Sequence, residues 1–291
     1  MKARRGREAP GDVERNMVSA VSEGFELRHE STPLIPLLRQ LVQSLSLIRI
    51  LARKDFYVRY RRASFGLLWA IGLPLVQATV LAFVLSRITR LHAPIAQAVF
   101  IYSGILPWNT FSTGLQSGTN SIVDNTAVAT RIYFPRAVFP IVVVLSGFYG
   151  LIPGVVVLVV MHLVLGGSVG PEIVLLLPAI GLCFMLTTSF ALVLSALQVY
   201  FRDIKHILAA ITLPWFWASG VFFQPESLGR VGRWFKWDPA VGMIQLFRAA
   251  LGAGGRDWVA AVWIAVGWSV GLTAIAVLVH RRYDRVFVDL L

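Results

Sequence analysis

One stretch of the sequence reads Asp55-Phe-Tyr-Val-Arg-Tyr-Arg-Arg-Ala-Ser-Phe-Gly-Leu-Leu-Trp-Ala-Ile-Gly-Leu-Pro74. Its first half carries Arg59, Arg61 and Arg62 among aromatic residues, and its second half begins a run without charge that ends at Arg87. Basic and aromatic residues directly before an apolar run are typical of a chain that enters a membrane from the side with anionic headgroups. We therefore expect the rest of the chain to alternate between apolar spans and short charged connections.

The composition of the whole chain agrees with this expectation. Of 291 residues, 56% are hydrophobic and only 14% are charged, and the mean hydropathy is +0.70. Soluble domains have about 25% charged residues, so the sequence predicts an all-α integral membrane protein. The net charge of +12 does not indicate nucleic-acid binding, because 13 of the 27 Lys and Arg residues precede Ala63 and make one membrane face basic. The single cysteine, Cys183, excludes a disulfide framework and a cysteine-based metal site.

Six uncharged runs are each long enough to cross the hydrocarbon core of a bilayer, which takes about 20 helical residues. In lipid, all backbone N–H and C=O groups of a run of this length can form hydrogen bonds only if the run is helical. The predicted spans lie near residues 65–86, 96–117, 138–164, 173–199, 206–223 and 258–280.

The chain before the first span divides into two parts. Residues 1–32 are polar and predict a flexible cytoplasmic tail, which leaves 33–291 as a single transmembrane domain. Residues 34–54 carry apolar side chains at helical spacing, interrupted by arginines. This pattern predicts an amphipathic helix in the membrane interface, or alternatively one packed on protein.

Loop charge predicts the orientation. With six spans, 20 Lys and Arg residues fall on the side of both termini and 7 on the other, which places both termini in the cytoplasm. The long connection 224–257 is rich in Trp and Pro, and its apolar segment is too short to cross. We expect non-spanning, re-entrant helices there, dipping into the outer leaflet.

The sequence has no evident machinery for catalysis. None of the predicted spans contains Asp, Glu, Lys or Arg, and none of the four lysines is followed by Ser or Thr, as a phosphate-binding loop requires. The chain is therefore predicted not to be an enzyme and to need no cofactor or metal of its own. Any work on a solute must draw energy from a partner.

Two short connections on the cytoplasmic side are candidates for docking that partner. In the first, Asp124 or Asn125 is positioned to cap a short helix that ends before Pro135. The second joins the spans 173–199 and 206–223. Simple solvated turns are the alternative for both. The candidate contact residues are Asp124, Asn125, Arg131, Tyr133, Phe134, Arg202 and Asp203.

Four stretches together resemble one permease family. They are Asp55 to Trp69, Tyr102-Ser-Gly-Ile-Leu-Pro-Trp-Asn109, Ile132-Tyr-Phe-Pro-Arg136 and Tyr200-Phe-Arg-Asp-Ile204. The chain is similar, from about Leu34 to its end, to the permeases of ABC transporters that export O-antigen, capsule and teichoic acid.

The resemblance implies a homodimer that binds two copies of a separate ABC ATPase, which would hold ATP and Mg. It also implies an interface helix, coupling helices in the two connections and re-entrant helices before the last span. The implied cargo is an undecaprenyl-diphosphate-linked polysaccharide of O-antigen, teichoic acid or cell-wall galactan type.

Two groups of residues are candidates for contact with such a cargo. Arginine can bind phosphate oxygens through two parallel hydrogen bonds. The basic residues directly before the first span, which we call the basic collar, would meet the lipid diphosphate at the cytoplasmic leaflet. Aromatic rings stack on sugars, and those in the spans would line the path of the polymer. The collar residues are Arg59, Tyr60, Arg61 and Arg62, and the aromatic residues are Trp69, Trp108, Phe111, Phe148 and Tyr149.

Other readings of these residues and of the chain remain open. The arginines can be plain membrane anchors, and each aromatic residue can be a packing or lipid-facing residue. An ABC exporter of small hydrophobic molecules would share the topology. A membrane-embedded transferase would need acidic residues or histidines that face a lipid substrate at one leaflet, whereas the candidates Asp55, Asp203, Asp257 and Asp284 are scattered along the sequence.

Overall fold

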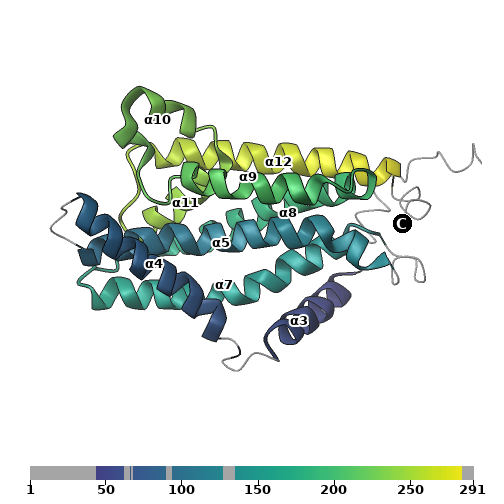
Figure 1. Cartoon of the computed structure of the whole chain (residues 1–291), viewed down its shortest axis with the longest axis horizontal. Helices are drawn as coiled ribbons and strands as arrows, with labels where there is room; N and C mark the ends of the chain where they lie inside the picture. Colours follow the sequence, from purple (N-terminus) through teal and green to yellow (C-terminus); the bar gives the residue numbers. More distant parts are fainter. Residues whose placement is uncertain (1–43, 62–65, 67, 90–93, 127–134, 284–291) are drawn as a thin grey trace, which may run out of the picture.

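The computed structural model describes residues 44–61, 66, 68–89, 94–126 and 135–283, and the regular elements of these residues are all helical (Figure 1). In chain order the elements are α3 (Leu45–Arg61), α4 (Leu68–Thr89), α5 (Pro94–Asp124), α7 (Val138–Val164), the 3₁₀ turn η2 (Pro171–Leu175), α8 (Leu176–Tyr200), α9 (Ile204–Ala218), the 3₁₀ turn η3 (Pro225–Leu228), α10 (Gly229–Phe235), α11 (Pro239–Ala249) and α12 (Trp258–Tyr283).

The long helices α5, α7, α8, α9 and α12 run along one axis, and α4 crosses them obliquely (Figure 1). The last residues of α5 and α12 and the first residues of α9 lie at the same end of the bundle, on the right in Figure 1. Helix α10 lies at the opposite end, and α3 packs along the first half of α7 through Ile48, Ala52, Val138 and Val142.

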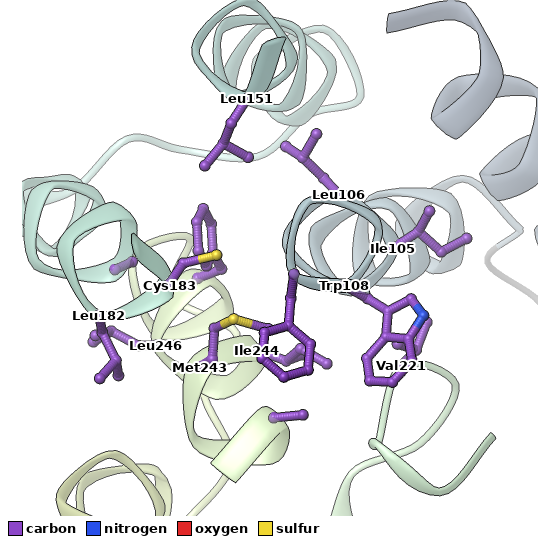
Figure 2. Close-up of a cluster of buried hydrophobic side chains, with 14 of the residues drawn as sticks. Ile105, Leu106, Trp108, Leu151, Leu182, Cys183, Val221, Met243, Ile244 and Leu246 are labelled. Atoms are coloured by element: carbon purple, nitrogen blue, oxygen red, sulfur yellow. The ribbon is translucent and has the colours of Figure 1, made fainter. Parts of the chain in front are cut away.

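The main core forms where α5 meets α8 and α11. Figure 2 shows side chains of α5, among them Ile105 and Trp108, together with Cys183 of α8 and Met243 of α11. All eleven residues of α11 are buried. Its two polar side chains, Gln245 and Arg248, are hydrogen-bonded inside the protein, so α11 is part of the interior rather than a surface connection.

Small residues let α5 and α8 approach closely. A Cβ atom on Gly114 would lie 2.5 Å from Thr187 Cγ2, and one on Gly118 would lie 2.6 Å from Ala191 Cβ. Since lipid supplies no hydrophobic force between helices, close packing at small residues is one of the main sources of attraction between them.

Three of the described helices are both long and apolar enough to cross a membrane: Val138–Val164, Pro171–Tyr200 and Trp258–Arg281. These correspond to the predicted spans 138–164, 173–199 and 258–280. Helix α5 misses this criterion although it has 31 residues, because many of them are polar. Helix α9 misses it because it has only 15 residues.

Several boundaries differ from the sequence expectation. Helix α3 continues to Arg61 rather than ending at residue 54, so that Arg59 and Arg61 are helical; residues 34–43 of the predicted interface helix lie outside the described part. Helix α5 runs seven residues beyond the predicted end at 117, and Asp124 therefore finishes this helix. Helix α9 ends at Ala218 rather than 223, because the chain turns at Gly220, whose φ is +78°.

Candidate functional site

A cleft of about 390 Å³, lined by both polar and apolar side chains, lies between α4, α5 and α7, with α3 at its edge, and we call it the polar cleft after its polar members. Residues from the middle of α5 and the first half of α7 form its wall, so it opens beside the centre of the bundle rather than at an end. The lining residues are Arg59, Trp69, Leu73, Pro74, Gln77, Leu106, Asn109, Thr110, Thr113, Gly147 and Gly150.

Arg59 reaches this cleft from the last turn of α3. It pairs with Asp55 one turn earlier, with 3.2 Å between Nη2 and Oδ2, and both side chains remain about a third exposed or more (34% and 40%). Trp69, 45% exposed, lines the same cleft. The structure thus brings together one predicted phosphate-binding residue and one predicted sugar-stacking residue.

The other collar residues are not placed in the cleft. Arg61 is exposed on α3, and the side chain of Tyr60 and all of Arg62 lie outside what the structure describes. A single guanidinium, that of Arg59, is therefore the cation of the cleft among the described residues.

The clearest feature that the sequence reasoning missed is a polar face of α5. Its members are Asn109, Thr113, Gln116, Asn120 and Asp124, and we call this set the α5 polar face. Successive members are four, three, four and four residues apart, so they share one side of the helix. Thr113, Gln116 and Asp124 are exposed, and the other two are half-buried. This spacing was visible in the sequence and could have identified the face.

The α5 polar face continues onto α4, since Asn109 Nδ2 donates a hydrogen bond of 2.9 Å to Gln77 Oε1. Asn120 of the α5 polar face donates from Nδ2 to Gln116 O at 3.2 Å, within its own helix. Thr119 and Ser121 are buried and donate to the carbonyl oxygens of Leu115 and Gly118. Exposed amides on a helix inside a membrane bundle would be unfavourable against lipid, so the α5 polar face requires water or polar groups opposite it.

Three of the predicted path aromatics lie in the core. Trp108 and Phe111 of α5 pack against Trp215 of α9, with ring centroids 5.8 Å and 5.3 Å apart. Phe148 of α7 meets Phe184 of α8 edge to face at 5.1 Å. In this chain these rings join helices, and none of the three lines the polar cleft.

Tyr149, the fifth predicted aromatic residue, lies on α7 beside α3. Its ring meets Phe56 edge to face at 5.7 Å, and the residue is half-buried. The contact secures the helix that carries Arg59 against α7.

The turn between α8 and α9 is held by one side chain. Gln198, which is 2% exposed, donates from Nε2 to Arg202 O at 3.0 Å and accepts the Lys205 amide at Oε1 at 2.9 Å. Phe201, Arg202 and Asp203 in this turn are exposed, and Ile204 is half-buried. Two of the predicted partner-contact residues are thus presented on a fixed turn.

The other predicted contact region is described only at its start. Asp124 is exposed at the end of α5, and Asn125 Nδ2 donates to Ser121 O at 2.8 Å. Arg131, Tyr133 and Phe134 lie outside the described residues.

At the opposite end, polar contacts tie α11 to the elements around α9. Asp238 caps α11 by accepting the Ala240 amide (2.9 Å) and also accepts the indole N–H of Trp215 (2.9 Å). Burial raises the pKa of Asp238 to about 6, and these two hydrogen bonds oppose the rise. Arg248, at the other end of α11, is fully buried and donates to Val221 O at 2.6 Å.

Among the described residues no three His, Cys, Asp or Glu side chains are grouped as a metal would need. The chemistry of the cleft is that of one guanidinium, one indole and several amides and hydroxyls. Such a set can bind an anion and hydrogen-bond hydroxyl groups, but it offers neither a nucleophile paired with a base nor paired carboxylates.

The model of the ABC-2 type transporter family matches residues 46–251, which is more than half of the chain. The chain therefore belongs to the ABC-2 type transporter family of multi-pass membrane proteins. It is a permease subunit and not itself an enzyme, because in this family the ATPase is a separate subunit.

Similar proteins include O-antigen export system permease proteins named RfbA. That of Myxococcus xanthus is 27% identical over 195 residues, which cover 67% of this chain and 75% of the relative. Two from Klebsiella pneumoniae are 24% identical over 204 residues (69% of this chain, 78% of the relative) and 22% identical over 246 residues (81% and 92%). The resemblance read from the sequence to polysaccharide-exporting permeases is confirmed.

Proposed function

We propose that this chain is the channel-forming subunit of an exporter that moves an undecaprenyl-diphosphate-linked polysaccharide out of the cytoplasm. Two copies would form the path, and two copies of a separate ABC ATPase would drive it. The observation that carries the proposal is the polar cleft, in which Arg59 and Trp69 lie beside the α5 polar face. A path for a sugar polymer needs such a surface, whereas a hydrophobic drug would not.

The proposed topology uses α4, α5, α7, α8, α9 and α12 as six spans, with both termini cytoplasmic at the inner membrane. Helix α3 would be the interface helix, and η3 to α11 the re-entrant segment. The complete burial of the 11-residue α11 supports this arrangement, because a helix too short to cross is tolerated at membrane depth when protein surrounds it.

The proposed site for the lipid diphosphate is Arg59 at the edge of the cleft. Its guanidinium can fork onto phosphate oxygens, while Trp69 stacks on the first sugar. The contact with Asp55 is exposed and therefore weak, so a diphosphate with two or more negative charges can displace it. Arg61 and Arg62 would attract the anion to the leaflet.

The proposed docking surface for the ATPase consists of the exposed α8–α9 turn and the end of α5. Both lie at the end of the bundle where α12 finishes (Figure 1), which the proposed topology makes cytoplasmic. Movement of the ATPase would reach the membrane through these two connections.

Reconstitution tests the function. The chain should copurify with an ABC ATPase, and the complex in proteoliposomes should hydrolyse ATP faster when a polyprenyl-diphosphate-linked glycan is added. A chain that purifies and transports without a nucleotide-hydrolysing partner would contradict the proposal.

Replacing Arg59 by glutamine should reduce export of the lipid-linked glycan about tenfold, since a charge-assisted hydrogen bond to a phosphate is worth roughly 1.5–3 kcal/mol. The measurement is glycan delivered to the outer leaflet per ATP hydrolysed. Arg53→Gln is the matched control on the same helix, because the Arg53 side chain lies 5.9 Å from the Tyr57 ring centroid and outside the cleft. Equal export by the two variants would refute the role of Arg59.

A further inference from the structure

Positive charge is nearly absent from the long helices. Helices α5, α7 and α8 contain no Lys or Arg, and α4, α9 and α12 carry theirs only in a terminal turn or close to one, at Arg87, Lys205, Arg281 and Arg282. The scarcity of Lys and Arg is a property of the sequence. It therefore holds for any of these helices that would line a path between two copies of the chain.

The other described arginines near the bundle do not form a row of cations along it, since Arg136 is buried directly before α7 and Arg49, Arg53 and Arg61 lie on α3. Arg59 stands alone in the cleft, beside Asp55. Arg248 is fully buried, and its guanidinium donates to Gly220 O and Val221 O and lies 3.5 Å from the centroid of the Phe100 ring. One phosphate group can therefore be met at the cleft, but a succession of them cannot.

The α5 polar face offers neutral hydrogen-bonding groups in place of charges. Carboxamides and hydroxyls each donate and accept, as sugar hydroxyls do. The single charged member, Asp124, is an exposed carboxylate at the end of α5. A negative group at that position repels an anionic polymer and not a neutral one.

The energetic difference between the two kinds of polymer is large in a narrow path. A neutral sugar that leaves bulk water exchanges hydrogen bonds with water for hydrogen bonds with amides at little net change. A charged phosphodiester or uronate also loses ion solvation, which costs several kcal/mol for each group that lacks a counter-charge. A polyanion thus needs repeated Lys or Arg residues that these helices do not have.

We propose that the polymer carried by this permease is an uncharged glycan, and that its sugars lie along the α5 polar face, between the cytoplasmic end of α5 and the Arg59 cleft. The proposal rests on the proposed export function and specifies its cargo. The anionic group of the cargo would then be confined to the lipid diphosphate, which is met once, at Arg59.

The test compares two lipid-linked polymers of equal length in proteoliposomes that hold the permease and its ATPase. One is a polyprenyl-diphosphate-linked neutral hexose polymer, and the other a polyprenyl-diphosphate-linked poly(glycerol phosphate). We expect the neutral polymer to be delivered at least tenfold faster. Equal or faster delivery of the anionic polymer overturns the cargo assignment while export itself stands, and delivery of neither overturns both.

Variants of the α5 polar face give a second measurement. The triple change Thr113→Leu, Gln116→Leu and Asn120→Leu favours membrane insertion, so the protein should still assemble with its ATPase, yet delivery of the neutral polymer should fall tenfold or more. Ala274→Leu, at an exposed position of α12, is the control and should deliver at the native rate. Native delivery by an assembled triple variant overturns the proposed path.

Discussion

Replacing Arg248 by methionine will lower the free energy of unfolding by about 3–5 kcal/mol, because buried carbonyl oxygens lose their donor. Arg248 donates to Gly220 O at 2.8 Å and to Val221 O at 2.6 Å, and it also contacts Phe100 O of α5 at 3.4 Å. The chain between α9 and η3 thus has its backbone groups satisfied by a side chain of α11. Methionine fills most of the volume but donates no hydrogen bond.

The measurement is the thermal unfolding midpoint of the purified protein in detergent. Arg256→Met is the matched control, since Arg256 is an exposed residue near the start of α12, and its midpoint should stay close to the native one. The unfolding midpoint of Arg248→Lys should lie between those of the other two variants, because an ammonium keeps the charge but lacks the planar array of donors of a guanidinium. A native midpoint for Arg248→Met would show that the carbonyl contacts contribute little.

Replacing Gln198 by leucine will uncouple transport from ATP hydrolysis. Its carboxamide bridges Arg202 O and the Lys205 amide across the α8–α9 turn, and leucine can replace neither contact. Two lost hydrogen bonds weaken the turn by about 1–3 kcal/mol, which is enough to populate other conformations of Phe201 and Asp203. We expect glycan-stimulated ATP hydrolysis to fall about tenfold while the basal rate of the complex is unchanged.

This readout separates a positioning role from a general loss of stability. Gln224→Leu is the control, because Gln224 Nε2 makes one long contact, 3.4 Å from Ala253 O, at the other end of the bundle. It should lower stability slightly and leave stimulation intact. If Gln198→Leu has normal stimulation, the α8–α9 turn is not the site through which the ATPase acts.

The sequence predicts helices well where a long apolar run indicates them. The apolar runs at 138–164, 173–199 and 258–280 appear as long apolar helices close to their predicted ends, because uninterrupted apolar sequence of this length has few other stable forms. Prediction from the sequence is less accurate at α5 and α9. Polar residues after 117 interrupt the apolar run, but their spacing continues one face of α5, and a single glycine such as Gly220 does not by itself predict that α9 ends before it.

The roles of the candidate site residues stay predictions, and the structure shows only where these residues lie. Arg59 and Trp69 belong to one short stretch, so sequence could propose both, although it assigned them to different tasks. Trp108 and Phe148 were chosen as path residues because aromatic rings suit sugars, yet a ring in a span serves equally as packing, and the neighbours that decide this come from other helices.

By itself the sequence determined that this is a helical, multi-pass membrane subunit without a nucleotide site, since hydropathy, charge and motif spacing are local properties of the chain. The tertiary structure decided which residues meet: Arg59 with the α5 polar face, Gln198 with both sides of its turn, and Arg248 with a segment more than 20 positions away. The contacts of Arg59 and Arg248 depend on how helices pack against one another, and those of Gln198 on the path of the turn after α8. Neither arrangement is encoded by the spacing or composition of residues within one helix.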